Sequence, residues 1–175
     1  MKKILSFALL SGIFAMQAFA QKPAEDKTKR PSPPATVTQK ITSGATITIN
    51  YSQPSVKGRT IGKDLDPMAG KVWRTGANEA TTFETNKDVM INGVSLPAGK
   101  YGLFTIWNGN DVTVIFNKTW EQWGAFKYKE EDDQLRFKAT AMDAKSSTEK
   151  MTFSISPEGE VSLLWGPKKV SFMVK

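Results

Sequence analysis

Apolar residues alternate with polar ones along much of this chain, and that period of two residues constrains the fold more than any other feature. The segment ATITINY at residues 45–51 is the clearest example, because isoleucine and tyrosine alternate there with threonine and asparagine. Successive side chains of a β-strand point to opposite faces, so such a segment buries one face and exposes the other. Ser43 and Gly44 can turn the chain back onto residues 37–41, which predicts an opening β-hairpin.

Further strand-like runs follow, separated by turn residues, at 80–85, 89–91, 99–107, 111–116, 134–141, 150–156, 160–165 and 169–174. Glycine, proline and asparagine mark chain reversals at residues 92–93, 108–110, 157–159 and 166–167. About ten short strands predict a single all-β domain, built as an antiparallel β-sandwich or a flattened barrel. Only residues 119–126 and 64–69 have a pattern that suits a short helix.

The first twenty residues have the pattern of an export signal. They contain two lysines, a short apolar run, and Ala18 and Ala20 in the spacing that signal peptidase recognises. The run is shorter than the roughly 20 residues needed to cross a bilayer, and no later segment is longer and equally apolar. We therefore predict a signal peptide at residues 1–20, no integral membrane segment in the mature chain, and a periplasmic or extracellular location in a bacterium.

Residues 21–35 carry four prolines, mixed charges and no large apolar side chain, so we expect a disordered Pro- and Lys-rich linker. The remaining residues, 36–175, have the length of one domain. Cleavage after residue 20 removes two lysines, which leaves 22 basic and 17 acidic residues and a net charge of +5. Because the basic residues are scattered, we expect no nucleic-acid binding. The oligomeric state is left open.

The chain contains neither histidine nor cysteine. Disulfides are therefore excluded, and zinc enzymes, Ser-His-Asp hydrolases, thiol proteases and haem proteins lose their usual ligands or bases. The acidic run at residues 130–133 lacks the spaced aspartates of a calcium-binding loop, so we expect a solvated turn there. We predict no metal and no cofactor.

Five segments, in order and across nearly the whole domain, resemble the DUF2911 family: YSQPSVKGRTIG, GKVWRTGANEATTF, LPAGKYGLFTI, VIFNKTWEQWGAF and LLWGPKKVSFMVK. Members of this family are exported bacterial proteins of unestablished function. The resemblance implies an all-β domain behind a signal peptide, and it supplies no catalytic residues. Residues 62–66 depart from the family's pattern, which has a bulky apolar residue after the Gly-Arg-Thr-Ile phrase, so this loop is expected to differ locally.

Polar and aromatic residues crowd the segment KVWRTGANEATTF at residues 71–83. If residues 80–85 form a strand, the residues just before them form a loop at the end of a rigid β-scaffold, where binding groups usually lie. Gly76 and Asn78 tolerate positive φ, so backbone N–H groups there can form an anion-binding concavity. Arg74 adds a planar donor fork suited to a carboxylate or phosphate.

A structural interpretation of the same segment stays open. In it, Arg74 pairs with Glu79 or another acid, and Thr75 and Asn78 cap the turn. Such a polar cluster fixes a conformation at little net gain in free energy, because desolvation offsets attraction.

The domain also contains five tryptophans, which can pack in a core or stack on flat ligand faces. Trp107 and Trp165 each close an alternating strand, so we expect them to be buried. Trp120 and Trp123 follow a strand end and are better placed for a binding rim.

Three functional hypotheses follow. The leading one is an exported domain that binds a small polar or glycan-like ligand, or an envelope partner, through a rim of Trp73, Arg74, Asn78, Glu79, Arg59, Trp120 and Trp123. The second is a metal-independent hydrolase that uses Glu79 as acid or base, with Arg74 stabilising negative charge. The third is a structural envelope protein without a pocket, which associates through exposed strand edges.

Overall fold

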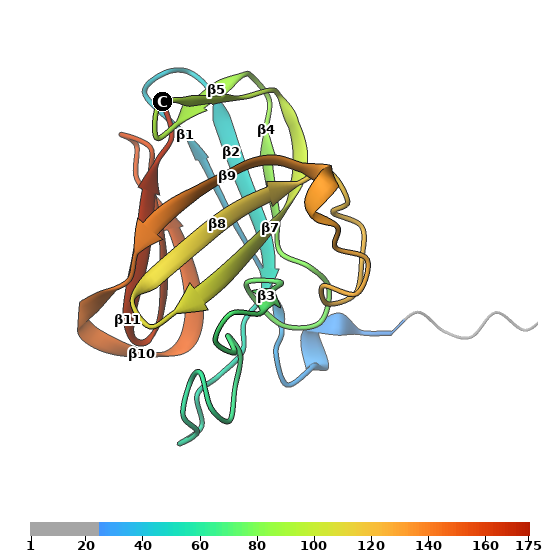
Figure 1. Cartoon of the computed structure of the whole chain (residues 1–175), viewed down its shortest axis with the longest axis vertical. Coiled ribbons are helices and arrows are strands. Elements are labelled where there is room, and N and C mark those ends of the chain that lie inside the picture. The colour runs from blue at the N-terminus through green and yellow to red at the C-terminus, as the bar shows by residue number, and fades with distance from the viewer. Residues whose placement is uncertain (1–24) are drawn as a thin grey trace, which may run out of the picture.

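The computed structural model describes residues 25–175. The predicted signal peptide and the first four linker residues lie outside this range. Within it the protein is all-β (Figure 1). The strands are β1 (Pro34–Lys40), β2 (Thr46–Ser52), β3 (Val72–Trp73), β4 (Thr82–Thr85), β5 (Val89–Ile91), β6 (Val94–Leu96), β7 (Gly99–Asn108), β8 (Asp111–Asn117), β9 (Asp133–Thr140), β10 (Met142–Ile155) and β11 (Glu160–Met173). Two 3-10 turns are η1 (Lys27–Lys29) and η2 (Glu130–Asp132).

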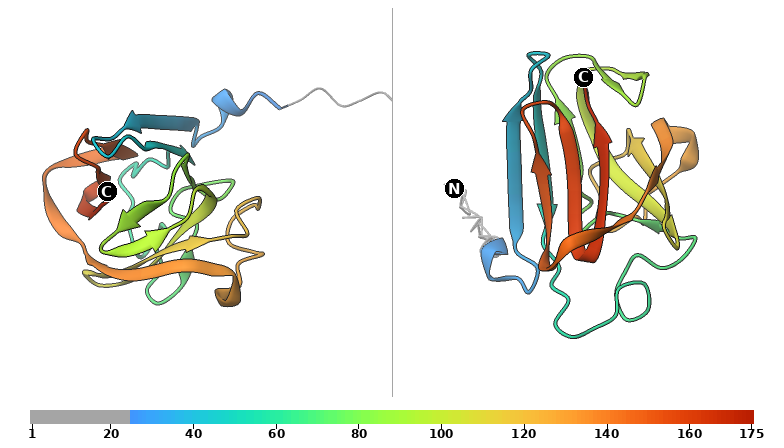
Figure 2. Two further views of the ribbon diagram at one scale, coloured as in Figure 1. Left: turned by 90° about the horizontal axis from the view of Figure 1, so that it is seen from above. Right: turned by 90° about the vertical axis from the view of Figure 1, so that its left-hand side faces the viewer.

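Two layers of antiparallel strands form a β-sandwich. The larger sheet has the order β1-β2-β4-β7-β8-β9, and β3 pairs with β7 beside β4. Strands β10 and β11 pair with each other and form the second layer. The large sheet curves around this layer, so that β1 contacts β10 and β9 contacts β11 (Figure 2). No ladder of hydrogen bonds joins these edges among the described residues, and the fold is a sandwich rather than a closed barrel.

The opening hairpin predicted from the period of two is confirmed. β1 and β2 pair antiparallel, with Val37 opposite Ile49. The two segments considered for short helices, residues 64–69 and 119–126, are turns and bends instead. Residues 64–69 make turn hydrogen bonds within their own loop, such as the Asp64 N–H to the Thr60 carbonyl. Residues 119–126 are bonded to a distant part of the chain, since the Ala80 N–H donates to the Gln122 carbonyl, and these bonds replace those of a helix.

Strand β11 turns back on itself at Gly166 and Pro167. Its 14 residues would span roughly 45 Å if straight, yet the Val174 N–H donates to the Gly159 carbonyl at 2.9 Å. Gly166 has φ of +55°, and the pairing register with β10 shifts beside it. The predicted reversal at residues 166–167 is therefore confirmed, and the two runs predicted around it are the two arms of β11.

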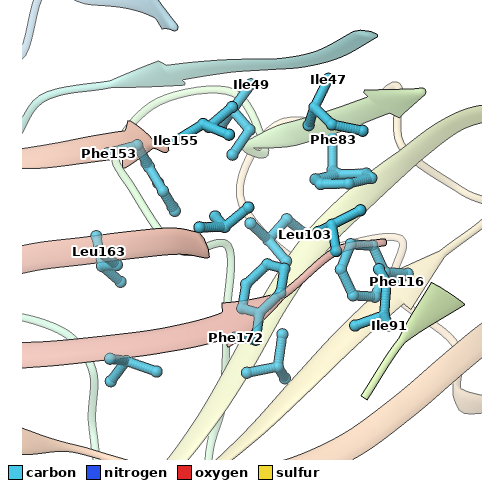
Figure 3. Close-up of a cluster of buried hydrophobic side chains, with 14 of the residues drawn as sticks. Ile47, Ile49, Phe83, Ile91, Leu103, Phe116, Phe153, Ile155, Leu163 and Phe172 are labelled. Atoms are coloured by element: carbon cyan, nitrogen blue, oxygen red, sulfur yellow. The ribbon is translucent and has the colours of Figure 1, made fainter. Parts of the chain in front are cut away.

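The core lies between the two layers, where the apolar faces of the alternating strands meet (Figure 3). The Phe116 ring packs edge-on against Phe83 at 4.9 Å and against Phe172 at 5.8 Å, so it joins the large sheet to β11. Burying each such side chain contributes about 1.5–3 kcal/mol. Residues that meet in this core include Ile47, Ile49, Phe83, Leu103, Phe116, Phe153, Leu163 and Phe172.

The segment expected to be a disordered linker is ordered in its described part, and this expectation is corrected for residues 25–35. Pro34 and Ala35 belong to β1 and pair with β2. Before them, residues 25–33 lie on the domain and carry η1. Composition predicted disorder because the segment has no apolar side chain to bury. Strand pairing and ion pairs hold it instead, as described below.

Candidate functional site

A pocket of about 560 Å³ opens at the end of the sandwich opposite the C-terminus. Four parts of the chain meet there: the long loop between β2 and β3, the β7–β8 turn, the middle of β10 and the fold-back of β11 (Figure 1). The lining residues are Val56, Arg59, Thr60, Ile61, Gly62, Pro67, Ala69, Trp107, Gly109, Ser147, Gly166, Pro167 and Lys168.

The long loop is held in shape by its own hydrogen bonds. The Thr60 carbonyl accepts the N–H of Asp64 at 2.8 Å, and the Asp64 carboxylate accepts the N–H of Thr60 at 2.9 Å. At its far end the Gly70 N–H donates to the Trp107 carbonyl at 2.9 Å, which ties the loop to β7. The polar run at residues 62–66 thus closes the turn that presents Arg59 and Ile61 to the pocket.

Gly166 makes the close approach of β11 to this loop possible. A Cβ on Gly166 would lie 2.7 Å from Cδ1 of Ile61, and the φ of +55° is one that other residues adopt at a cost. Bulges and bends in strands often re-aim side chains next to functional sites. Here the bend places Pro167 and Lys168 on the pocket wall.

The inner end of the pocket adjoins a chamber of about 30 Å³ whose walls are largely indole. Trp73 and Trp165 stack there with ring centroids 5.7 Å apart, and both line the chamber together with Trp107. Ile61, Pro67, Trp107 and Lys168 line both spaces, so the chamber and the pocket are neighbours separated by the side chains they share.

The three indole N–H groups at this site differ in their partners. Trp73 Nε1 donates to the Gly76 carbonyl at 3.0 Å, and Trp107 Nε1 donates to Thr105 Oγ1 at 3.0 Å. Trp165 is only 6% exposed, and its Nε1 has no hydrogen-bond partner in the described part of the chain. Buried polar groups are nearly always paired, so this unpaired donor is an exception that needs an explanation.

Two cationic side chains line the pocket, and only one of them has an acidic partner among the residues that the structure describes. Lys168 Nζ pairs with Asp143 Oδ1 at 2.8 Å and also donates to Asn110 Oδ1. Arg59 donates from Nη2 to the Ser55 carbonyl at 2.9 Å and from Nε to the Val56 carbonyl at 3.2 Å. Within residues 25–175, Arg59 forms no ion pair and no acidic residue lines the pocket.

The rim predicted from the sequence is not assembled as one site. Arg59 lines the pocket, and Trp73 lies beneath it, 3% exposed and stacked in the chamber wall. Arg74 follows β3 and reaches Asp66 at 3.9 Å. Burial lowers the pKa of Arg74, an effect that Asp66 partly offsets, and its Nε has no partner among the described residues. Of the two pairings that the structural interpretation allowed, Arg74 thus has the one with another acid, Asp66, and not the one with Glu79.

Asn78, Glu79 and Trp123 lie together elsewhere, where residues 25–33 cover them, and we call this region the Glu79 corner. Asn78 Nδ2 donates to the Ser32 carbonyl at 2.9 Å. Glu79 accepts hydrogen bonds from Lys27 Nζ and from Arg30 Nη1, both at 2.8 Å. The Arg30 guanidinium also lies 5.6 Å from the centre of the Trp123 ring.

The Glu79 carboxylate is held in its charged form. Partial burial alone would raise its pKa, but hydrogen bonds from Lys27, from backbone N–H and from Arg30 outweigh that effect and lower the pKa to about 2. A general acid needs a pKa nearer the working pH. This low pKa does not suit Glu79 to the general-acid role in the hydrolase hypothesis, and Glu79 forms no ion pair with Arg74 in the described residues.

Trp120, the remaining rim residue, is half-buried, and the Lys100 ammonium lies 4.2 Å from the centre of its ring. It joins neither the pocket nor the Glu79 corner. Sequence reasoning missed Ile61, Pro67 and Lys168 as site residues. The expected burial of Trp165 is confirmed and Trp107 is half-buried against the same core, but sequence reasoning did not predict that both also line the chamber. The one available signal was the Trp-Gly-Pro-Lys run at residues 165–168, where an indole and a cation flank a reversal.

In residues 25–175 no helix is both long and apolar enough to cross a membrane. The same part of the chain holds no cluster of three or more acidic side chains that could bind a metal ion.

The fold and site define a class of protein: a two-layer β-sandwich with an indole-walled pocket at one end. The chain belongs to the DUF2911 family, described as proteins of unknown function, whose model matches residues 32–174. No curated protein and no solved structure matched the chain.

Proposed function

We propose that this is an exported bacterial binding protein whose end pocket takes a small ligand with a flat apolar body and a hydrogen-bond acceptor. The observation that carries the proposal is the Trp165 indole N–H, which is buried without a partner among the described residues on a side chain that lines the chamber. Leaving such a donor unpaired costs about 1–3 kcal/mol. A ligand acceptor that reaches it removes that cost, which favours the bound state.

The size and lining of the pocket support this proposal. Its volume of about 560 Å³ lies within the range of roughly 300–1,000 Å³ typical of small-molecule sites. Its walls are mainly apolar, through Ile61, Pro67 and Trp107, with a few polar groups between them. Indole faces bind flat partners such as aromatic rings or the apolar face of a sugar. The pocket also weighs against the hypothesis of a structural protein that has none.

Export is part of the proposal and rests on the pattern of residues 1–20. The absence of cysteine and histidine from the chain fits a binding role, because neither a thiol nor an imidazole is available for catalysis.

A thermal-shift screen of the purified protein against aromatic and sugar compounds tests the proposal, because a ligand that binds only the folded state raises its melting temperature. The decisive variant is Trp165→Phe, which keeps a ring in the chamber wall but removes the N–H. We expect compounds that stabilise the wild type to bind this variant roughly 3–10-fold more weakly, the loss of one hydrogen bond.

The matched control is Trp123→Phe, which makes the same change at an indole in the Glu79 corner. We expect it to bind every such compound as the wild type does. The proposal would be contradicted if stabilising compounds bound Trp165→Phe and the wild type with equal affinity. A screen in which no compound stabilises the wild type would also contradict it.

A further inference from the structure

We infer that the ligand is an organic anion, a flat ring compound with one carboxylate, and that Arg59 binds the carboxylate. This inference rests on the proposed function and adds the charge of the ligand. Its evidence is the state of Arg59 at the pocket wall, which differs from that of every other arginine in the described residues.

Arg59 is the one arginine of the four without an acidic partner in residues 25–175. Arg30 pairs with Glu25 and Glu79, Arg74 contacts Asp66, and Arg136 pairs with Glu130 and Asp133. Arg59 also differs in position, since it alone among them lines the pocket.

Two backbone carbonyls hold the Arg59 guanidinium in place. The Ser55 carbonyl accepts from Nη2 and the Val56 carbonyl accepts from Nε, while Nη1 has no partner among the described residues. Neutral carbonyls orient a guanidinium without neutralising it. Fixing the group before the ligand arrives reduces the entropy lost on binding.

None of the neighbouring acids forms an ion pair with Arg59 among the described residues. Asp143 pairs with Lys168, and Asp66 contacts Arg74. The carboxylates of Asp64 and Glu149 accept the backbone N–H groups of Thr60 and Lys57 instead. The single unpaired positive charge matches a single carboxylate, whose two oxygens suit the planar donor fork of arginine. The apolar walls then fit a ring rather than a highly charged ligand.

The test compares 2-naphthoate with 2-naphthamide, two compounds of the same shape that differ in charge. Binding to the purified protein is measured by tryptophan fluorescence and by calorimetry at low and high salt. We expect the wild type to bind the carboxylate roughly tenfold or more tightly than the amide, as hydrogen bonds to a charged group imply. We expect added salt to reduce this preference.

The variants are Arg59→Gln and Lys63→Gln. Both remove one positive charge from the same loop, but Lys63 does not line the pocket. We expect Arg59→Gln to abolish the preference for the carboxylate and Lys63→Gln to keep it. Arg59→Lys, which keeps the charge and loses the fork, should retain part of the preference, and it provides a second reading if Arg59→Gln lowers the stability of the loop.

Equal binding of the two compounds by the wild type overturns the inference, as does equal loss of preference in Arg59→Gln and Lys63→Gln. Failure of both compounds to bind overturns it as well. The proposed function is judged separately: if the amide binds as well as the acid and both weaken in Trp165→Phe, the pocket is a binding site for neutral ligands. If binding ignores Trp165→Phe, the proposed function fails too.

Discussion

The Glu79 corner and the end pocket both gather polar groups and indoles, yet they differ in what is left unpaired. In the corner, the protein's own N-terminal segment supplies a carbonyl to Asn78 and two cations to Glu79. In the pocket, Trp165 Nε1 and the charge of Arg59 have no such partners in the described chain. A crowd of polar residues therefore does not identify a binding site. The binding function proposed for the pocket depends instead on hydrogen-bonding capacity that the fold leaves unused.

The two regions also differ in how they are attached to the core. Trp73 and Trp165 are both buried and stacked, so the pocket floor is part of the core itself. Trp123 in the corner is 52% exposed, and the ion pair of Lys27 with Glu79 lies at the surface, although the Arg30 side chain is only 11% exposed. Exposed ion pairs contribute about 0–1 kcal/mol each. Truncating a side chain in the corner should therefore cost little stability, whereas truncating one in the pocket floor should cost much more.

The largest expected effect follows from this difference. Trp73→Ala removes a stacked indole from the chamber wall and should lower the free energy of unfolding by about 3–5 kcal/mol. Trp123→Ala, the same substitution in the corner, should change it by less than about 0.5 kcal/mol. Urea denaturation of both variants measures the two values. Similar losses would show that the corner, too, is part of the core.

A smaller effect is expected at the bend of β11. Gly166→Ala forces an unfavourable φ and places a methyl group 2.7 Å from Ile61. Strain in the backbone costs about 1–2 kcal/mol, and the contact adds to it. Gly93→Ala is the control, because Gly93 also has positive φ but has open space around its Cβ position. Both should lose stability, and only Gly166→Ala should also impair ligand binding. Equal ligand binding by both variants would show that the bend at Gly166 does not shape the pocket.

The smallest effect concerns pH and Glu79. Its pKa in the folded protein, about 2, is below the ordinary value of 4.5, so its ion pairs contribute fully above pH 4.5 and are lost as the pH falls toward 2. Glu79→Gln should therefore release residues 25–33 at neutral pH while ligand binding stays unchanged. Carboxyl NMR titration measures the pKa, and amide exchange of residues 27–32 reports the release. A Glu79 pKa near 4.5 would show that Lys27 and Arg30 do not pair with this carboxylate.

The fold was largely predictable because alternation along a strand is a local property. Residues 45–51 show it, and they form β2. The first half of β10 was missed because its sequence is polar and charged. It forms a strand because Met142 and Asp143 pair with Lys169 and Lys168 of β11. Likewise β3 is two residues long and is a strand because it pairs with β7. No local sequence pattern predicts that pairing.

The site was predictable only in part. Arg59 and Trp73 were named as binding residues, and both belong to the pocket region, although Trp73 is buried in its chamber wall. Asn78, Glu79, Trp120 and Trp123 suit binding by residue type, but their contacts lie elsewhere. The sequence shows which side chains can bind a ligand, but it does not show which residue each of them contacts in the fold. In most of these cases the contacting residue is 30 or more positions away along the chain.

The sequence alone determined the all-β class, the opening hairpin and the reversal at residues 166–167. Each of these depends on neighbouring side chains and on the ability of glycine to adopt positive φ at a turn. The tertiary structure decided which polar groups satisfy one another. In the tertiary structure Glu79 pairs with Lys27 and Arg30 of the N-terminal segment, whereas Arg59 lines the pocket and Trp165 lines the chamber. Pairing depends on distances across the fold rather than along the chain.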